Sequence, residues 1–555
     1  MSHPAFLKHQ PVLEQALAAI ESRRYWTPYP ESPSPRAYGE DGADKGKEAF
    51  NGHLGKHFEL NQPGQTGWHS AESSPYGVAL DVSYPVCDPT ALIAASKEAM
   101  PQWQSVGAQG RTGICLEILH RLNQQSFEIA HAVMMTTGQG WMMAFQAGGP
   151  HAQDKGLESV VWAWREQSFI PAQAHWEKPQ GKNPPIQMRK HFEIVGRGVG
   201  LVIGCGTFPT WNTYPGLFAA LATGNGVIIK PHSNAILPAA ITVRTIRSVL
   251  QEFGIDPNLV SLCVAPNRGV TQALATHPDI KSIDFTGGNS FGQWLYENCK
   301  QANVYAELAG VNNIVIDSTD AYKAMLGNIA FTLSLYSGQM CTTTQAIFVP
   351  ANGIQTDEGH KSFDDVCTDL GRAIERFLSK PEVACAVLGA IQSKDTTERI
   401  ELANSGQLGK VILPSRTISN PDFPGALVRT PILLTCDASD ESAYMQERFG
   451  PISFVVKVAD TAAAIALSER VVSTHGALTV GIYSTNEAVI DTMTNATWRS
   501  KVALSINLTG SVLVNQSAGF SDYHGTGANP AANASYTDAA FVANRFRVVQ
   551  RRCHV

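Results

Sequence analysis

The sequence predicts an α/β fold built on parallel sheets, and three observations point to it. Short apolar runs bounded by glycine or proline, such as "GVGLVIGCG" and "GNGVIIKP", are typical of strands buried on both faces. Stretches with helical periodicity, such as "LPAAITVRTIRSVLQEFG", separate these runs. Strand and helix therefore alternate as in βαβ units, whose functional residues collect at the carboxyl ends of the strands.

The elements are expected in a clear order along the chain. A helix over residues 11–23 precedes "TPYPESPSPRAYGEDG", whose prolines break regular structure. A long helical region runs from Pro89 to about Trp164, and "EKPQGKNPP" after it is expected to be a loop. A first series of strands is predicted at "GVGLVIGCG", "GNGVIIKP", "VSLCVAP", "IKSIDFTGG" and "NNIVIDS". A second block runs from about Asn312 to Val514, with strands at "QAIFVP", "ISFVVKV" and "LTVGIYS".

Length and composition exclude several classes of protein. At 555 residues the chain is too long for one core, so two or three domains are expected. The net charge of -6 offers no basic field for nucleic acid, and no apolar stretch approaches the roughly 18 residues of a membrane span. The ten cysteines are scattered without a CxxC pair, which indicates reduced thiols and a cytoplasmic location. His53 and His57 have no further candidate ligands nearby, so no metal site is expected.

Four polar segments fall at predicted strand ends or turns: "PTWN" (209–212), "KPHS" (230–233), "YAELAG" (305–310) and "SGQMC" (337–341). Each has an ordinary structural explanation when taken alone, as a turn residue, a strand end or a solvated carboxylate. Together they hold the parts needed for a thiol-based oxidation of an aldehyde. A thiolate attacks the carbonyl, an amide holds the oxyanion, a carboxylate activates water, and a bound nicotinamide accepts hydride.

In the same chain order, these segments resemble the aldehyde dehydrogenase superfamily. "GQMC" is similar to the family's Gly-Gln-x-Cys motif, which makes Cys341 the nucleophile. "AELAG" is similar to its Glu-Leu-Gly-Gly signature, which makes Glu307 the general base, 34 positions before Cys341 as in the family. "PTWN" looks like the turn whose asparagine, here Asn212, holds the oxyanion. The stretch from Asn212 to Lys230 is shorter than the family's, so the helix behind this amide is expected to be reshaped.

The resemblance also implies cofactor-binding residues. "ATGNGVIIKP" would contact the adenosine ribose, "IDFTGG" the phosphates, and "QERFGPI" the nicotinamide ribose. Members that prefer NAD usually carry a glutamate where this chain has Ser233, and that carboxylate would repel a 2′-phosphate. NADP is therefore the expected cofactor, with NAD as the alternative. The expected cofactor-binding residues are Lys230, Ser233, Thr286, Gly287, Gly288, Glu447 and Phe449.

The N-terminal extension and "SDYHGTGANPAANASY" (521–536) resemble one branch of the superfamily, that of the phenylacetic acid degradation protein PaaN. That branch implies a semialdehyde substrate from aromatic-compound degradation, which can carry a CoA thioester. Three alternatives stay open: a dehydroadipyl-CoA semialdehyde dehydrogenase of benzoyl-CoA breakdown, a CoA-acylating aldehyde dehydrogenase, and a non-catalytic scaffold. Glu307 argues against the second, since CoA-acylating members generally lack the general base. Retention of Glu307, Cys341 and Asn212 argues against the third.

By the same resemblance, the chain divides into three parts. Residues 1–183 and 202–309 are expected to form the N-terminal extension and dinucleotide-binding domain, and residues 310–515 the catalytic thiol domain. Residues 184–201 and 540–555 are expected to be oligomerisation strands that pair with each other. Because an unpaired strand edge favours association, we expect a homodimer or homotetramer.

Overall fold

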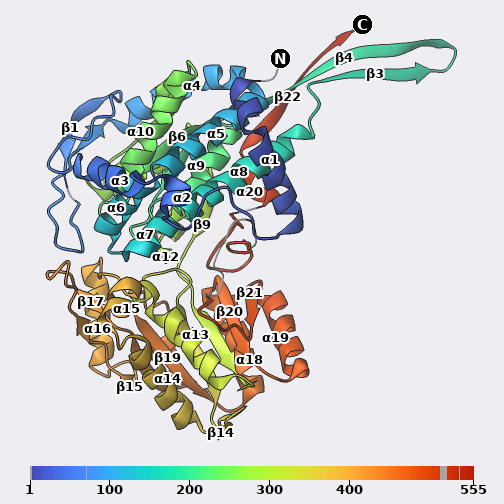
Figure 1. Cartoon of the computed structure of the whole chain (residues 1–555). Coiled ribbons are helices and arrows are strands. Elements are labelled where there is room, and N and C mark those ends of the chain that lie inside the picture. Colours follow the sequence, from blue (N-terminus) through green and yellow to red (C-terminus); the bar gives the residue numbers. More distant parts are fainter. Residues whose placement is uncertain (1–2, 71, 513–519, 521, 537) are drawn as a thin grey trace.

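The computed structural model describes residues 3–70, 72–512, 520, 522–536 and 538–555. Figure 1 shows an upper and a lower block, and a ribbon of strands that leaves the upper one. Each block is a sheet covered by helices, which confirms the predicted α/β class. None of the described helices is both long enough and apolar enough to cross a membrane.

The N-terminal residues form helices that belong to the core of the upper block. These helices are α1 (Pro4–Ser22), α2 (Pro35–Tyr38), α3 (Gly42–Asn51), α4 (Pro89–Ser105), α5 (Gly107–Gln124), α6 (Ser126–Thr137), α7 (Trp141–Gly148) and α8 (Pro150–Ser168), with β1 (Gln65–His69) and β2 (Tyr84–Cys87) pairing between them. The first helix starts before the predicted residue 11, because His3 caps it and Pro4 suits the first helical position. Helix α1 packs on α5, where His9 contacts the buried carboxylate of Glu117.

The sheet of the upper block has five parallel strands in the order β7-β6-β5-β8-β9. Lys230, Thr286 and Glu307 are the last residues of β6, β8 and β9, so the parallel arrangement brings them to one edge. The elements are β5 (Val199–Ile203), α9 (Tyr214–Ala222), β6 (Gly226–Lys230), α10 (Leu237–Glu252), β7 (Val260–Leu262), α11 (Arg268–Thr276), β8 (Ile280–Thr286), α12 (Asn289–Asn298) and β9 (Asn303–Glu307).

The sheet of the lower block has seven strands in the order β15-β18-β19-β12-β10-β20-β21, and only β15 is antiparallel to its neighbour. Its strands are β10 (Asn312–Ile316), β12 (Thr344–Pro350), β15 (Lys410–Leu413), β18 (Ile432–Asp437), β19 (Ile452–Val458), β20 (Thr479–Tyr483) and β21 (Ala503–Ile506). Its helices are α13 (Tyr322–Ser334), α14 (Phe363–Phe377), α15 (Pro381–Val387), α16 (Lys394–Asn404), α17 (Glu441–Tyr444), α18 (Thr461–His475) and α19 (Glu487–Ser500). Residues 513–515, the end of the expected catalytic domain, lie outside the described residues.

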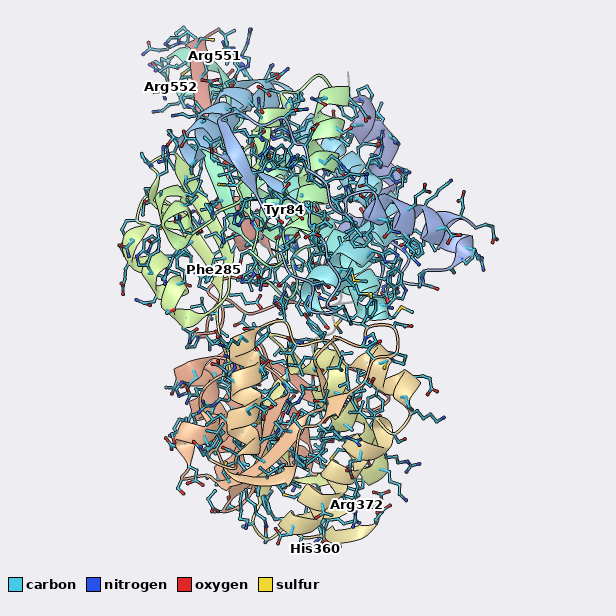
Figure 2. All side chains as sticks on the ribbon, turned by 90° about the vertical axis from the view of Figure 1, so that its left-hand side faces the viewer. Tyr84, Phe285, His360, Arg372, Arg551 and Arg552 are labelled. Carbon is cyan, nitrogen blue, oxygen red and sulfur yellow. The ribbon has the colours of Figure 1, made fainter. Side chains whose placement is uncertain are left out.

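Three antiparallel strands form the ribbon in the order β22-β4-β3: β3 (Gln173–Gln180), β4 (Asn183–Gly196) and β22 (Phe546–His554). Figure 2 shows Arg551 and Arg552 of β22 far from the lower block. The pairing of β4 with β22 agrees with the sequence prediction, and its role in oligomerisation stays a prediction. The prediction of a loop at "EKPQGKNPP" is wrong, since β3 and β4 run through this stretch and the chain turns only at residues 181–182. The prolines of this stretch are compatible with strands because β22 pairs with β4 only as far as Met188. This end of the ribbon therefore has two strands, and both are edge strands.

A buried ion pair ties β22 to the sheet of the upper block. Arg545, directly before β22, donates two hydrogen bonds, of 2.8 and 2.6 Å, to the carboxylate of Asp284 in β8. The guanidinium carbon also lies 4.2 Å from the centroid of the Tyr305 ring. The two side chains are 1% and 5% exposed, so either charge left alone would be buried without compensation.

Replacing Arg545 by methionine should therefore destabilise the protein. The Arg545→Met variant keeps most of the side-chain volume but leaves the Asp284 carboxylate unpaired, and we expect the free energy of unfolding to fall by about 3–5 kcal/mol. Urea denaturation followed by circular dichroism measures this change. As a control, Arg372→Met alters a side chain that is 73% exposed and should change the free energy by less than about 0.5 kcal/mol. An Arg545→Met midpoint equal to that of the control would contradict the prediction.

Candidate active site

One cavity of about 660 Å³ contains every site residue predicted from the sequence. Residues of the upper block line one side of it, and loops of the lower block with the start of α16 line the other. The predicted residues on its wall are Asn212, Lys230, Ser233, Thr286, Gly287, Gly288, Glu307, Cys341, Glu447 and Phe449. The assigned roles remain predictions, but the residues share one space.

Cys341 follows a turn of three residues in the left-handed conformation. The φ angles of Tyr336, Ser337 and Gly338 are 52°, 49° and 65°. Two of these residues have side chains, so the turn stores strain of about 1–3 kcal/mol per residue. At Gly338 a Cβ atom would lie 2.4 Å from the carbonyl oxygen of Gly450, so only glycine fits there.

Side-chain hydrogen bonds hold this turn in place. The Tyr336 hydroxyl donates to the carbonyl of Thr137 at 2.6 Å, and the Ser337 hydroxyl contacts the carbonyls of Gly389 and Arg429 at 3.0 and 2.8 Å. Because these acceptors belong to both blocks, the position of the turn depends on how the blocks meet.

Asn312 fixes the other side of the Cys341 loop. Its amide Nδ2 donates to the carbonyls of Cys341 and Thr343 at 2.7 and 3.1 Å. Its Oδ1 accepts from the backbone N–H groups of Leu478 and Thr479 at 3.0 and 3.2 Å. Asn312 was not predicted as a site residue, although it lies only five positions after Glu307.

The amide of Asn212 lies between two side chains that determine its orientation. Its Nδ2 lies 3.4 Å from Oε2 of Glu307, and its Oδ1 accepts from the thiol of Cys205 at 3.4 Å. A thiol donates to the amide oxygen and a carboxylate accepts from the amide nitrogen, so both neighbours favour the orientation in which Nδ2 points to Glu307. Cys205 was not predicted as a site residue. Its position two residues after the carboxyl end of β5 is the feature that could have indicated it.

The far end of the cavity is suited to a dinucleotide. The turn Thr286-Gly287-Gly288 leads from β8 into the N-terminus of α12, an arrangement that offers backbone N–H groups to phosphates. A Cβ atom on Gly288 would meet nothing within 4 Å, so the turn is open to a ligand. Lys230 and Arg268 supply positive charge on the same wall.

Glu447 lies on the wall formed by the lower block. Burial raises the pKa of its carboxyl to about 7, although a backbone hydrogen bond from Gly310 opposes the shift. The loop that carries it is joined to the Cys341 segment, because the backbone N–H of Arg448 donates to Oε1 of Gln345 at 2.9 Å. A ribose hydroxyl is a suitable partner for such a carboxyl group.

A model of the aldehyde dehydrogenase family matches residues 87–527 of this chain. The chain belongs to the aldehyde dehydrogenase family. It is an oxidoreductase that acts on the aldehyde group, as the sequence predicted. The match includes all ten predicted site residues.

Known relatives of this aldehyde dehydrogenase agree in fold and family. The crystal structure of an NAD-dependent aldehyde dehydrogenase from Burkholderia multivorans is 57% identical, with a TM-score of 0.98 over 100% of both chains. An NADP-dependent glyceraldehyde-3-phosphate dehydrogenase from Bacillus halodurans C-125, complexed with NADP, is 20% identical, with a TM-score of 0.66 over 90% of this chain and 98% of that one.

The curated relatives are more distant in sequence. An N-succinylglutamate 5-semialdehyde dehydrogenase from Yersinia pseudotuberculosis serotype IB (strain PB1/+) is 24% identical over 72% of this chain and 74% of its own length. Further curated relatives are matched over 58% of their own length.

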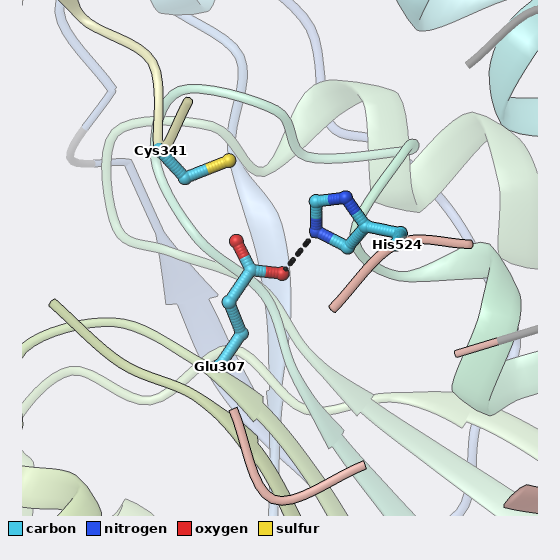
Figure 3. A group of neighbouring side chains, drawn as sticks. All are labelled: Glu307, Cys341 and His524. Atoms are coloured by element: carbon cyan, nitrogen blue, oxygen red, sulfur yellow. Dashed lines mark hydrogen bonds and ion pairs between the residues drawn. The ribbon is translucent and has the colours of Figure 1, made fainter. Parts of the chain in front are cut away.

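Three side chains of this aldehyde dehydrogenase form a compact group at the centre of the site. Figure 3 shows the carboxylate of Glu307 between the sulfur of Cys341 and the imidazole of His524. The sulfur, the imidazole nitrogen and the carboxylate oxygen all lie within 4.8 Å of one another. His524 was not predicted as a site residue, because nothing in the sequence of residues 521–536 indicates that this segment returns to β9.

The group has a definite charge pattern. Burial, reinforced by the neighbouring Glu307 carboxylate, holds the pKa of the Cys341 thiol well above its usual range. Burial also acts to raise the pKa of Glu307, but His524 and the Cys341 thiol outweigh it and leave that pKa below its usual value. The structure therefore pairs a neutral thiol with an ionised carboxylate.

This pattern predicts an alkaline pH profile for thiol reactivity. A raised thiol pKa delays thiolate formation, so the rate of inactivation by iodoacetamide should still be rising above pH 9. Replacing Glu307 by glutamine removes a negative charge that raises this pKa, and the rise should move to lower pH. Glu398→Gln, at a side chain 66% exposed, is the control and should leave the profile unchanged. Identical profiles for Glu307→Gln and wild type would refute the assignment.

Proposed function

We propose that this aldehyde dehydrogenase oxidises an aldehyde to a carboxylic acid through a thioester on Cys341, with NADP or NAD as hydride acceptor. The observation that carries the proposal is the meeting of Cys341, Glu307 and Asn212 at one end of a cavity whose other end offers Lys230 and an open glycine turn. Both dinucleotides occur among the structural relatives reported above.

The residues act in a fixed order. The Cys341 thiol first releases its proton, which is the proton that the overall oxidation sets free, and the thiolate attacks the aldehyde carbon. Nδ2 of Asn212 and the backbone N–H of Cys341 hold the oxyanion of the thiohemiacetal. When bound, the nicotinamide accepts the hydride. Glu307 then takes a proton from water, whose oxygen attacks the thioester carbon. The carbon–sulfur bond breaks, the acid leaves, and the Cys341 sulfur takes up the proton to become the thiol again. Burial and the neighbouring Glu307 carboxylate raise the pKa of the resting thiol, so these two factors oppose formation of the thiolate.

Exchanging the general base separates the two halves of this reaction. Glu307→Gln should give a burst of reduced cofactor close to one per active site, followed by turnover slowed by about 100-fold or more. Rapid-mixing absorbance at 340 nm measures both phases. Adding free CoA distinguishes the CoA-acylating alternative, because CoA would then restore turnover in the variant and be required by the wild type. Full steady-state turnover of Glu307→Gln without CoA would refute the role of Glu307.

For the substrate, we propose a semialdehyde of aromatic-compound degradation, in the phenylacetate branch typified by PaaN, where substrates can carry a CoA thioester. The support is the resemblance of residues 521–536 to that branch, together with the place of its described part, residues 522–536, beside Glu307. A dehydroadipyl-CoA semialdehyde is the second candidate. Initial rates with CoA-linked, aromatic and short aliphatic aldehydes at equal concentration decide between them.

The preference for NADP over NAD rests on Ser233. The carboxylates on the cavity wall are Glu307 and Glu447, both on the catalytic side, so none faces Lys230 and Ser233 among the lining residues. His232 adds no charge, because burial and the nearby Lys230 lower its pKa to about 4. A 2′-phosphate therefore meets Lys230 without an opposing anion.

Introducing a carboxylate at this position should reverse the preference. We expect Ser233→Glu to lower kcat/KM for NADP by about tenfold or more, because like charges repel, and to change kcat/KM for NAD little. Ser233→Gln is the matched control of similar size without the charge. A wild-type kcat/KM clearly higher for NAD than for NADP would overturn the proposed preference.

We infer the remaining organisation from the arrangement of the chain. Residues 1–183 and 202–309 would form the dinucleotide-binding domain and residues 310–515 the catalytic domain, with the β3-β4-β22 ribbon as the contact for a homodimer or homotetramer. An edge strand such as β22 has unpaired backbone groups that a second subunit can satisfy. A cytoplasmic location is supported by the ten cysteines, all of which are described and free.

A further inference from the structure

His524 is a buried side chain at the reaction centre that the mechanism above does not use. Its Nε2 lies 2.7 Å from Oε2 of Glu307, and the two side chains are 2% and 1% exposed. An ionised carboxylate only accepts hydrogen bonds, so Nε2 carries the proton. Figure 3 shows that the second carboxylate oxygen points to the other side, toward the sulfur of Cys341.

The backbone holds His524 in this position through the strand that carries Glu307. The segment 524–536 runs beside β9, where Leu308 N–H donates to the carbonyl of Ala531 at 2.8 Å. The side chain of Asn533 accepts from the N–H of Ala306 at 2.9 Å and donates to the carbonyl of Val304 at 2.8 Å. His524 and Glu307 are therefore anchored to one strand, and their separation is set by direct contacts.

Two aromatic rings fix the plane of the imidazole. Trp211, the neighbour of Asn212, lies edge-on to it with the ring centroids 4.6 Å apart. Tyr536 stacks against it with the centroids 5.9 Å apart. The nearby titratable groups are Glu307 on β9, Cys341 on its loop, Tyr536 and Asp522 on the same segment and, beyond Trp211, Lys155 on α8.

We propose that His524 is a positioning residue for Glu307, which fixes the orientation and charge of the general base in thioester hydrolysis. By donating to Oε2, the imidazole leaves Oε1 to the water that attacks the thioester. Among N–H and O–H groups of the described residues, none donates to the buried Oε1. That oxygen therefore remains available for the proton of the water.

The hydrolytic step is balanced without any oxidant. The oxygen of water bonds to the thioester carbon, its proton passes to Oε1 of Glu307, and the carbon–sulfur bond breaks with its electron pair on the sulfur. The proton then passes to the Cys341 sulfur, so that thioester and water become acid and thiol. The His524 N–H remains on Oε2 and limits rotation of the carboxylate during the transfer.

The inference rests on the proposed function, and an ester substrate allows the two to be tested separately. p-Nitrophenyl acetate acylates a reactive cysteine without a dinucleotide, so its burst reports acylation and its steady rate reports hydrolysis. The variants are His524→Ala, His524→Gln, whose amide can still donate to Oε2, and His360→Gln as control. His360 is exposed on β14 (Gly359–Lys361), far from the cavity (Figure 2).

We expect His524→Ala to keep the burst and to slow the steady rate at least about tenfold, because a misplaced base loses efficiency. His524→Gln should recover part of the rate, and His360→Gln should match the wild type. The acid limb of the steady rate should move to higher pH in His524→Ala, since Glu307 loses the partner that lowers its pKa. Circular dichroism of each variant confirms that it is folded.

Three outcomes would overturn the inference: a His524→Ala steady rate and pH limb equal to those of the wild type, loss of the burst in folded His524→Ala, or a His524→Gln variant no faster than His524→Ala. The first outcome would show that His524 has no role in hydrolysis. The second would show that His524 acts on the Cys341 thiol, and the third that its hydrogen bond to Glu307 does not contribute to the rate. A wild-type enzyme that hydrolyses the ester but oxidises no aldehyde would instead defeat the proposed function.

Discussion

The burial of an ionised carboxylate beside a thiol is the constraint on which the rest of the site depends. Glu307 has almost no contact with water, and loss of that hydration costs several kcal/mol unless polar groups replace it. The replacement comes from His524 on one side, with Asn212 at a longer distance and the Cys341 thiol close by. Since Glu307 and these three groups come from four separate parts of the chain, the site exists only when both blocks and the returning segment are in place.

The loop of Cys341 meets the same requirement in a different way. A left-handed turn at Tyr336–Gly338 is unfavourable alone, yet hydrogen bonds to α6 and to loops of the lower block hold it. Asn312 then connects the loop to β10 and β20. A nucleophile held from both ends has few alternative positions, which favours a short, repeatable approach to a carbonyl carbon.

Local patterns in the sequence predicted the fold class, and the resemblance of short motifs at strand ends and turns to the family pointed to ten residues that the cavity brings together. His524 could not be found in this way. Its contact with Glu307 spans 217 positions and depends on amide side chains such as Asn533, whose pairing with a strand edge leaves no periodic pattern. The strands through "EKPQGKNPP" were missed for a related reason, since the sequence does not show which strands pair there. Prolines are compatible with edge strands, and this end of the ribbon has only β3 and β4.

The pair of Arg545 and Asp284 has a thermodynamic consequence. Asp284 stands two positions before Thr286, at the turn suited to phosphates, and Arg545 directly precedes β22, the strand that extends away from the upper block. The pair therefore connects the strand proposed for subunit contact with the strand that leads to this turn. Linkage is reciprocal: if a subunit on β22 and a dinucleotide at the turn favoured the same arrangement of this pair, each would raise the affinity for the other by the same factor.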